Sequence, residues 1–141
     1  GIDSLSEIAE VVLANAKSQV KDKRQAYGEL LDQMNDTIRK FRDLPGKHVY
    51  AVAKQEHIKD EATGTSLFGP SFPGSKLSQG TPYLFDEVFH IGVAKTNDGD
   101  SYRYLRTQPD LQYDAKDRSG ALDEIEQPNL TYLFDKIMNG E

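Results

Sequence analysis

The sequence predicts an α/β fold, in which a mixed sheet has flanking helices and an antiparallel hairpin toward the C-terminus. Three features predict this class. Apolar residues recur at helical spacing in residues 5–16 and 26–41, an uninterrupted apolar run follows at 48–53, and alternating residues flank a turn sequence between 87 and 107. Because the chain has 141 residues, 37% of them hydrophobic, we expect a single domain over residues 1–141.

A helix is predicted to begin directly after a short strand at the start of the chain. Ile2-Asp3 has the pattern of the end of a buried strand, and Ser4-Leu5-Ser6-Glu7 is a capping box. In such a box the serine oxygen accepts a hydrogen bond from an early helical amide, and the glutamate reaches back to the cap. The expected apolar face consists of Leu5, Ile8, Ala9, Val12, Leu13 and Ala16.

A second helix is predicted from about Asp22 to Asp43, ended by Pro45-Gly46. Its apolar stripe consists of Ala26, Tyr27, Leu30, Leu31, Met34, Ile38 and Phe41. The run His48–Ala53 then has the pattern of a strand buried on both faces of a largely parallel sheet. It leads to Gln55, and polar residues at the carboxyl end of such a strand are where open α/β sheets bind ligands.

The stretch from about Ile58 to Pro82 is predicted to be irregular, because glycines and prolines interrupt it throughout. A loop of this length is usually either functional or disordered. Beyond it, Glu87–Thr96 and Ser101–Thr107 are expected to pair as a hairpin around a turn at 97–100. A terminal helix is predicted from about Asn129 to Met138.

The net charge of −6 argues against a protein that binds nucleic acid through its whole surface. The stretch from Lys17 to Arg24 nevertheless carries four cations against one acid. It is either a local basic groove or a pair of solvated helix ends, with cations favoured near a helix C-terminus by the helix dipole.

Several chemistries are excluded by residue types. The chain has no cysteine, so it has no disulfides or thiolate sites, and its three histidines lack the i, i+4 spacing of a helical metal site. Any metal would therefore need oxygen ligands. A serine nucleophile elbow is absent, and no apolar run of roughly eighteen residues indicates a membrane segment. An independent enzyme is not expected.

Five short segments, taken in order, carry a resemblance to a known family. They are Ile2-Asp3-Ser4-Leu5, Tyr27-Gly28, Leu44-Pro45-Gly46-Lys47-His48-Val49, Phe85-Asp86-Glu87-Val88 and Ala115-Lys116-Asp117-Arg118. The chain resembles the C-terminal half of a RecA-like (P-loop NTPase) core, and most closely the phage nucleotide-binding proteins that act as recombinase-like, single-strand-annealing ATPases. The resemblance implies that the intact protein binds ATP and Mg²⁺, forms oligomers and acts on single-stranded DNA in the cytoplasm, that of the host cell if the protein is phage-encoded.

The resemblance also implies roles for four residues in catalysis. Asp3 would be the Walker B aspartate, which holds the water shell of the magnesium bound to ATP, and Gln55 would sense the γ-phosphate. Lys116 and Arg118 would reach across a subunit interface to the γ-phosphate held by a neighbouring protomer. The alternatives are an ordinary helix-flanking aspartate, an exposed glutamine, and a solvated basic turn paired with Asp114 and Asp117.

The segment 58–82 would occupy the position of the DNA-binding loop. In it, Lys59 and Lys76 could meet backbone phosphates, and Phe68 or Phe72 could stack on bases. Alternatively, the two phenylalanines pin the loop to the body of the domain.

The chain departs from the family in one respect, because it contains no GxxxxGK[ST] phosphate loop. Gly69–Lys76 approaches the pattern, but two prolines lack the amides that a phosphate nest needs, and no helical pattern is evident after Lys76. We therefore expect the sequence to begin inside a domain, to self-associate or bind a Walker A-bearing segment, and not to hydrolyse ATP alone. Two alternatives remain: a non-catalytic module that docks onto an ATPase partner, and a small single-stranded DNA-binding domain.

Overall fold

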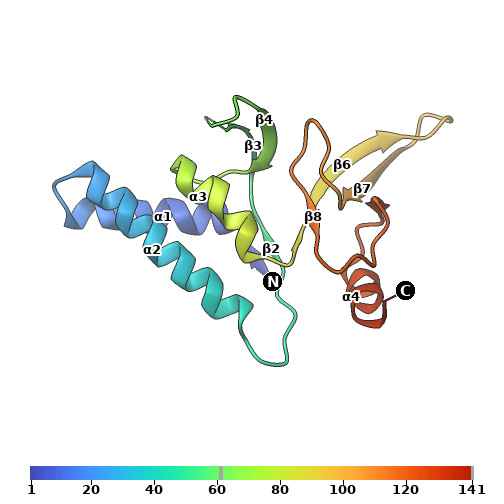
Figure 1. Ribbon diagram of the computed structural model, residues 1–141, viewed down its shortest axis with the longest axis horizontal. Coiled ribbons are helices and arrows are strands. Elements are labelled where there is room, and N and C mark those ends of the chain that lie inside the picture. The colour runs from blue at the N-terminus through green and yellow to red at the C-terminus, as the bar shows by residue number, and fades with distance from the viewer. Residues whose placement is uncertain (61, 141) are drawn as a thin grey trace. The chain divides into compact units, whose positions relative to one another are not determined.

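The computed structural model describes residues 1–60 and 62–140, and these form two compact units (Figure 1). Unit 1 comprises Gly1–Ile58 and Pro70–Phe85, and unit 2 comprises the described parts of Lys59–Gly69 and Asp86–Glu141. The single domain over residues 1–141 stays a prediction.

Unit 1 begins with a short strand and a capped helix, as predicted. β1 spans Ile2–Asp3, and α1 spans Leu5–Gln19. The Ser4 side chain accepts a hydrogen bond from the backbone N–H of Glu7 at 3.2 Å, and the Asp3–Ser4 peptide is cis. The face of α1 that is buried contains Leu5, Ser6, Ala9, Leu13 and Ala16.

The second helix, α2, spans Lys23–Arg42 and packs against α1 (Figure 1). Asp22 caps it by accepting a hydrogen bond from the Arg24 amide at 2.9 Å. Four residues of the predicted stripe are buried: Ala26, Leu30, Met34 and Ile38. Tyr27 and Phe41 lie at the margins of the stripe and are 40% and 42% exposed.

The strand predicted over residues 48–53 is shorter and less buried than expected. β2 spans only Ala51–Val52, and Tyr50 and Val52 are 46% and 44% exposed. The prediction of burial on both faces is wrong for this strand. The reason is that Ala51 and Ala53 pack against the core of unit 1, whereas the alternate side chains point away from it.

The stretch predicted to be irregular contains several regular elements, although residue 61 lies outside the described residues. β3 spans Gln55–Lys59, β4 spans Ser66–Pro70, α3 spans Ser75–Gly80 and a 3₁₀ turn, η1, spans Thr81–Leu84. The expectation that no helix follows the lysine at 76 is wrong. Gly74, with φ of +92°, turns the chain into α3, and Leu77 is buried in the core of unit 1.

Unit 2 contains the predicted hairpin. β6 (His90–Lys95) pairs antiparallel with β7 (Ser101–Arg106), and Gly99, with φ of +91°, lies in the connecting turn. β7 also pairs antiparallel with β9 (Ile125–Glu126). A second small sheet pairs β5 (Glu87–Val88) with β8 (Lys116–Asp117).

The terminal helix of unit 2 is also confirmed. α4 spans Leu130–Asn139, and Asn129 caps it by accepting a hydrogen bond from the Tyr132 amide. Leu133 on α4 forms a small core with Leu105 and Leu122. The described fold is therefore mixed α/β, with four helices and small sheets, and the RecA-like core stays a prediction. None of the helices described is long and apolar enough to cross a membrane.

Candidate functional site

In unit 1, the carboxyl ends of β1 and β2 lie at one sheet edge. The two strands pair in parallel, with Ile2 opposite Ala51 and Asp3 opposite Val52, and the Ile2 amide donates to the Tyr50 carbonyl at 2.9 Å. Since paired parallel strands end on the same side, Asp3 lies beside the residues that follow β2. Gln55 comes three residues after Val52 and begins β3.

A buried serine connects this edge to α1 and to the segment after β4. The Ser6 hydroxyl, 3% exposed, accepts a hydrogen bond from the Lys54 amide at 2.9 Å and donates one to the Ser71 carbonyl at 2.6 Å. The Ser71 amide returns a hydrogen bond to the Lys54 carbonyl at 2.6 Å. The backbone next to Gln55 is therefore held on both sides, and no local sequence pattern indicates this role of Ser6 because its partners are 48 and 65 residues away.

Asp3 has the exposure and the chemistry of a partial metal ligand. Its carboxylate is exposed at the sheet edge. No group of three or more metal-binding side chains occurs in the described part of the chain. A magnesium ion oriented by Asp3 through its water shell would therefore take its direct ligands from phosphate oxygens and water, which is how Mg²⁺ usually binds with nucleotides.

In unit 2, Lys116 and Arg118 are positioned by the pairing of β8 with β5. Glu87 lies opposite Asp117, and Val88 lies opposite Lys116. The Arg118 guanidinium binds Asp86 Oδ1 at 2.8 Å, with both side chains largely exposed, 75% and 69%. The carboxylate that pairs with Arg118 is therefore Asp86, and not the Asp114 or Asp117 of the alternative interpretation.

Next along β5 and β8 lie two carboxyl groups, those of Glu87 and Asp117, whose pairing the sequence did not indicate. Burial, followed by the hydrogen bond and the charge of Asp117, raises the pKa of Glu87 to about 7. Burial opposes ionisation of Asp117 too, but hydrogen bonds from Ser119 and Glu87 hold the pKa of Asp117 below its usual value. The two residues are thirty apart in sequence, so only strand pairing brings them together.

The candidates for nucleic-acid binding are divided between the two units. Lys59 and Lys76 are exposed. Phe68 stacks on Tyr113 with ring centroids 5.5 Å apart, and Tyr113 also stacks on His90 at 3.9 Å. Phe72 is only 5% exposed and belongs to the core of unit 1, so for this residue the structure favours the pinning alternative over base stacking.

Comparison with known proteins gave one finding. The sequence profile of a protein family described as AAA domain matches residues 2–119. No significant match was found among curated proteins or among solved structures. The matched range includes both strands of the Asp3 edge, Gln55, Lys116 in β8 and Arg118 directly after it. Because the profile matches most of the length of the chain, the chain belongs to the AAA domain family and is a nucleotide-binding, ATPase-like module.

Proposed function

We propose that this chain is the C-terminal part of a phage recombination ATPase, which in intact form binds ATP and Mg²⁺, oligomerises and acts on single-stranded DNA. One observation carries the proposal: in a member of the AAA domain family, β1 and β2 pair in parallel and bring Asp3 beside the strand end that leads to Gln55. Ligand chemistry in open α/β sheets occurs at such strand ends.

In this proposal Asp3 orients the water shell of the magnesium ion that ATP carries. Its exposed carboxylate suits a hard cation. Gln55 responds to the γ-phosphate, and the hydrogen bonds of Ser6 and Ser71 to Lys54 hold the backbone immediately before it. A shift of Gln55 would therefore be passed to the segment after β4.

The phosphate cradle is proposed to come from a Walker A-bearing segment outside these 141 residues. Within them, Gly69–Lys76 lacks the GxxxxGK[ST] pattern, and Pro70 and Pro73 provide no amides. Lys76 lies inside α3, a helix of only 6 residues. The chain therefore supplies the magnesium-directing half of the site and not the phosphate-binding half.

Lys116 and Arg118 are proposed to act on the γ-phosphate of a neighbouring protomer. Arg118 is exposed, and its partner Asp86 is exposed as well, so a phosphate could replace that carboxylate at little cost. Lys59, Lys76 and Phe68 are proposed to contact single-stranded DNA. Phe72 is left out of this set because it is part of the core.

The first test compares Asp3→Asn with the control Asp32→Asn, which removes an equal charge from an exposed position on α2. Both are made in a version extended toward the N-terminus that carries the phosphate loop. We expect Asp3→Asn to lower Mg²⁺-dependent ATP hydrolysis about 10- to 100-fold, as loss of an outer-sphere ligand does. Hydrolysis at the rate of the control would contradict the proposal.

The second test concerns the action in trans. Asp3→Asn and Arg118→Ala should each hydrolyse ATP much more slowly than wild type when present alone in the extended protein. Mixed in equal amounts, they should recover activity, because some interfaces then combine an intact Asp3 with an intact Arg118. If no activity returns on mixing while the variants still co-assemble in light scattering, the trans role of Arg118 is wrong.

A further inference from the structure

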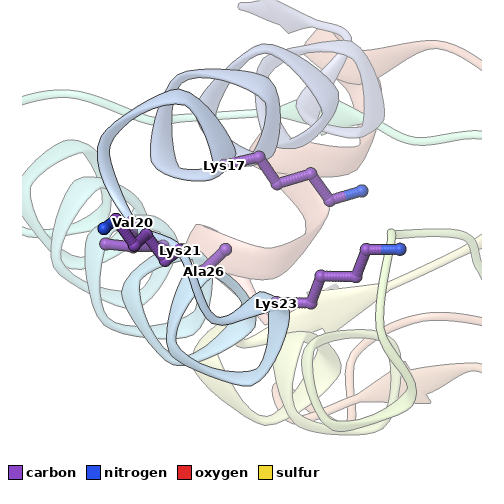
Figure 2. A pocket seen from close by; sticks show the side chains of 5 residues that line it. All are labelled: Lys17, Val20, Lys21, Lys23 and Ala26. Carbon is purple, nitrogen blue, oxygen red and sulfur yellow. The ribbon is translucent and has the colours of Figure 1, made fainter.

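The turn between α1 and α2 of unit 1 carries a cluster of cations, which we call the basic elbow: Lys17, Lys21, Lys23 and Arg24. Three of these side chains, those of Lys17, Lys21 and Lys23, line a small cavity of about 170 Å³, together with Val20 and Ala26 (Figure 2). In Figure 2 the side chains of Lys17, from α1, and Lys23, from α2, extend in the same direction. Two ammonium groups on one side of a turn repel each other unless an anion lies near them.

The cations of the basic elbow form no ion pair within the described residues, and all four are exposed. Elsewhere in the chain six cations do pair with carboxylates: Lys40, Arg42, Lys54, Arg106, Arg118 and Lys136. The elbow has a single acid, Asp22, and its side chain is used to cap α2. The ammonium of Lys17 lies 5.5 Å from the centre of the Tyr27 ring, which restrains it beside the cavity.

The helix dipole explains only one of these charges. Lys17 lies in the last turn of α1, where a cation is favoured. Lys23 and Arg24 are the first two residues of α2, whose first turn has no acidic residue, and cations are disfavoured at that end of a helix. The elbow therefore holds positive charge at a position where folding alone would select against it.

We propose that the basic elbow binds the phosphate groups of a single-stranded nucleic acid. An unpaired cluster of lysine and arginine attracts a polyanion by releasing its counterions. A lipid surface fits less well, because membrane-binding elements add exposed apolar side chains, whereas here Val20 is half-buried and Ala26 is buried. The identity of the ligand rests on the proposed function, but the elbow shares no residue with the Asp3 edge or with Lys59, Lys76 and Phe68.

The test measures binding of a fluorescently labelled single-stranded oligonucleotide to the 141-residue chain by anisotropy over a range of salt concentrations. The elbow variant is Lys21→Gln/Lys23→Gln/Arg24→Gln. Its matched control is Lys47→Gln/Lys95→Gln/Arg103→Gln, which removes the same charge from exposed residues that make no ion pair within the described residues. A third variant, Lys59→Gln/Lys76→Gln, tests the contacts of the proposed function, and thermal unfolding shows that each variant is folded.

We expect the elbow variant to bind at least about tenfold more weakly than the control at low salt. The slope of log affinity against log salt should also fall by about 2, since each lost contact to a single strand removes about 0.7. Equal weakening by the elbow variant and its control would overturn the elbow site.

Weakening by the Lys59/Lys76 variant alone would overturn the elbow and leave the proposed function intact. If the wild-type chain binds no oligonucleotide but binds anionic phosphatidylserine vesicles through the elbow, the ligand is a membrane and the inference is wrong. The ATP hydrolysis of the extended Asp3→Asn protein is unaffected by any of these outcomes, so it tests the proposed function separately.

Discussion

At the scale of single residues, Ser6 joins three segments of unit 1 through one hydroxyl. It accepts a hydrogen bond from Lys54 and donates one to Ser71, 48 and 65 residues away in sequence. The residue lies on the buried face of α1, where a hydroxyl would be costly without partners. In the capping box Ser4 is the cap, and Ser6 instead binds the buried backbone of two other segments.

Ser6→Ala should destabilise the fold, because it leaves the Lys54 amide and the Ser71 carbonyl without the hydroxyl. We expect the free energy of unfolding to fall by about 1–3 kcal/mol, as for other buried polar groups that lose a partner. Urea denaturation followed by circular dichroism measures this loss. The control is Ser18→Ala on the same helix, where an exposed hydroxyl donates only to the nearby Asn15 carbonyl; an equal loss there would contradict the role of Ser6.

Glu87 should make stability depend on pH near neutrality. Its pKa is about 7 in the folded protein and 4.5 as the reference value, so the folded state holds the proton more tightly. This contribution is fully present below about pH 4.5 and is lost as the pH rises through about 7. Glu87→Gln removes the titration, so its stability relative to wild type should rise between about pH 5 and about pH 8.

Chemical denaturation of both proteins at these two pH values measures the difference. The lowered pKa of Asp117 affects folding stability in a different pH range. Its contribution to stability is lost only as the pH falls below the ordinary pKa range of an aspartate. Glu10→Gln, at an exposed position on α1, is the control and should show no such trend. A Glu87→Gln protein that followed wild type at both pH values would disprove the raised pKa.

At the scale of secondary-structure elements, α2 carries cations at both ends. They are unfavourable to the helix dipole at its start and favourable at its end. Lys23 and Arg24 occupy the first turn, and Arg39 lies in the last. Lys23→Gln and Arg24→Gln should each raise the stability of the folded protein by about 0.3–1 kcal/mol at low salt, and Arg39→Gln should lower it by a similar amount.

Thermal unfolding at low and high salt checks these opposite signs, since screening should shrink both effects. If neutralising Lys23 and Arg24 raises folding stability and also weakens oligonucleotide binding, these two cations reduce stability in favour of binding, as the basic elbow implies. Loss of stability in these two variants would show instead that the charges at the start of α2 serve the fold.

At the scale of the whole molecule, each unit has its own hydrophobic core. Leu30 is central to the core of unit 1 and Leu133 to that of unit 2; both are 1% exposed, and the two clusters share no residue. Leu30→Ala and Leu133→Ala should each cost about 2–5 kcal/mol, the usual range for a buried leucine.

Hydrogen exchange should place each loss in its own unit. With Leu30→Ala, we expect the amides of α1 and α2 to exchange faster while those of α4 stay protected, and the reverse with Leu133→Ala. Equal loss of protection in both units for either variant would mean that the chain unfolds as one cooperative body.

Local patterns predicted the elements whose causes are local. The capping box placed the start of α1, the apolar spacing identified the buried face of α2, and the turn chemistry around Gly99 located the hairpin of β6 and β7. Asp3 was a candidate because its pattern is also local: the end of a strand and the helix cap that follows it lie within four consecutive residues.

The remaining features depend on contacts between distant residues, which no window of sequence contains. Within residues 48–53 only Ala51–Val52 form a strand, and Phe72 is a core residue because it packs in the cluster of buried residues from α1, α2 and α3. Arg118 pairs with Asp86, and Glu87 meets Asp117, only where β5 and β8 align. The sequence by itself thus determined the three longer helices α1, α2 and α4, the hairpin and the identity of the candidate residues, whereas it did not reveal α3. Only the tertiary structure decided which of them are buried, which are paired, and that the cations of the basic elbow have no carboxylate partners among the described residues, because pairing and desolvation are properties of neighbours in space.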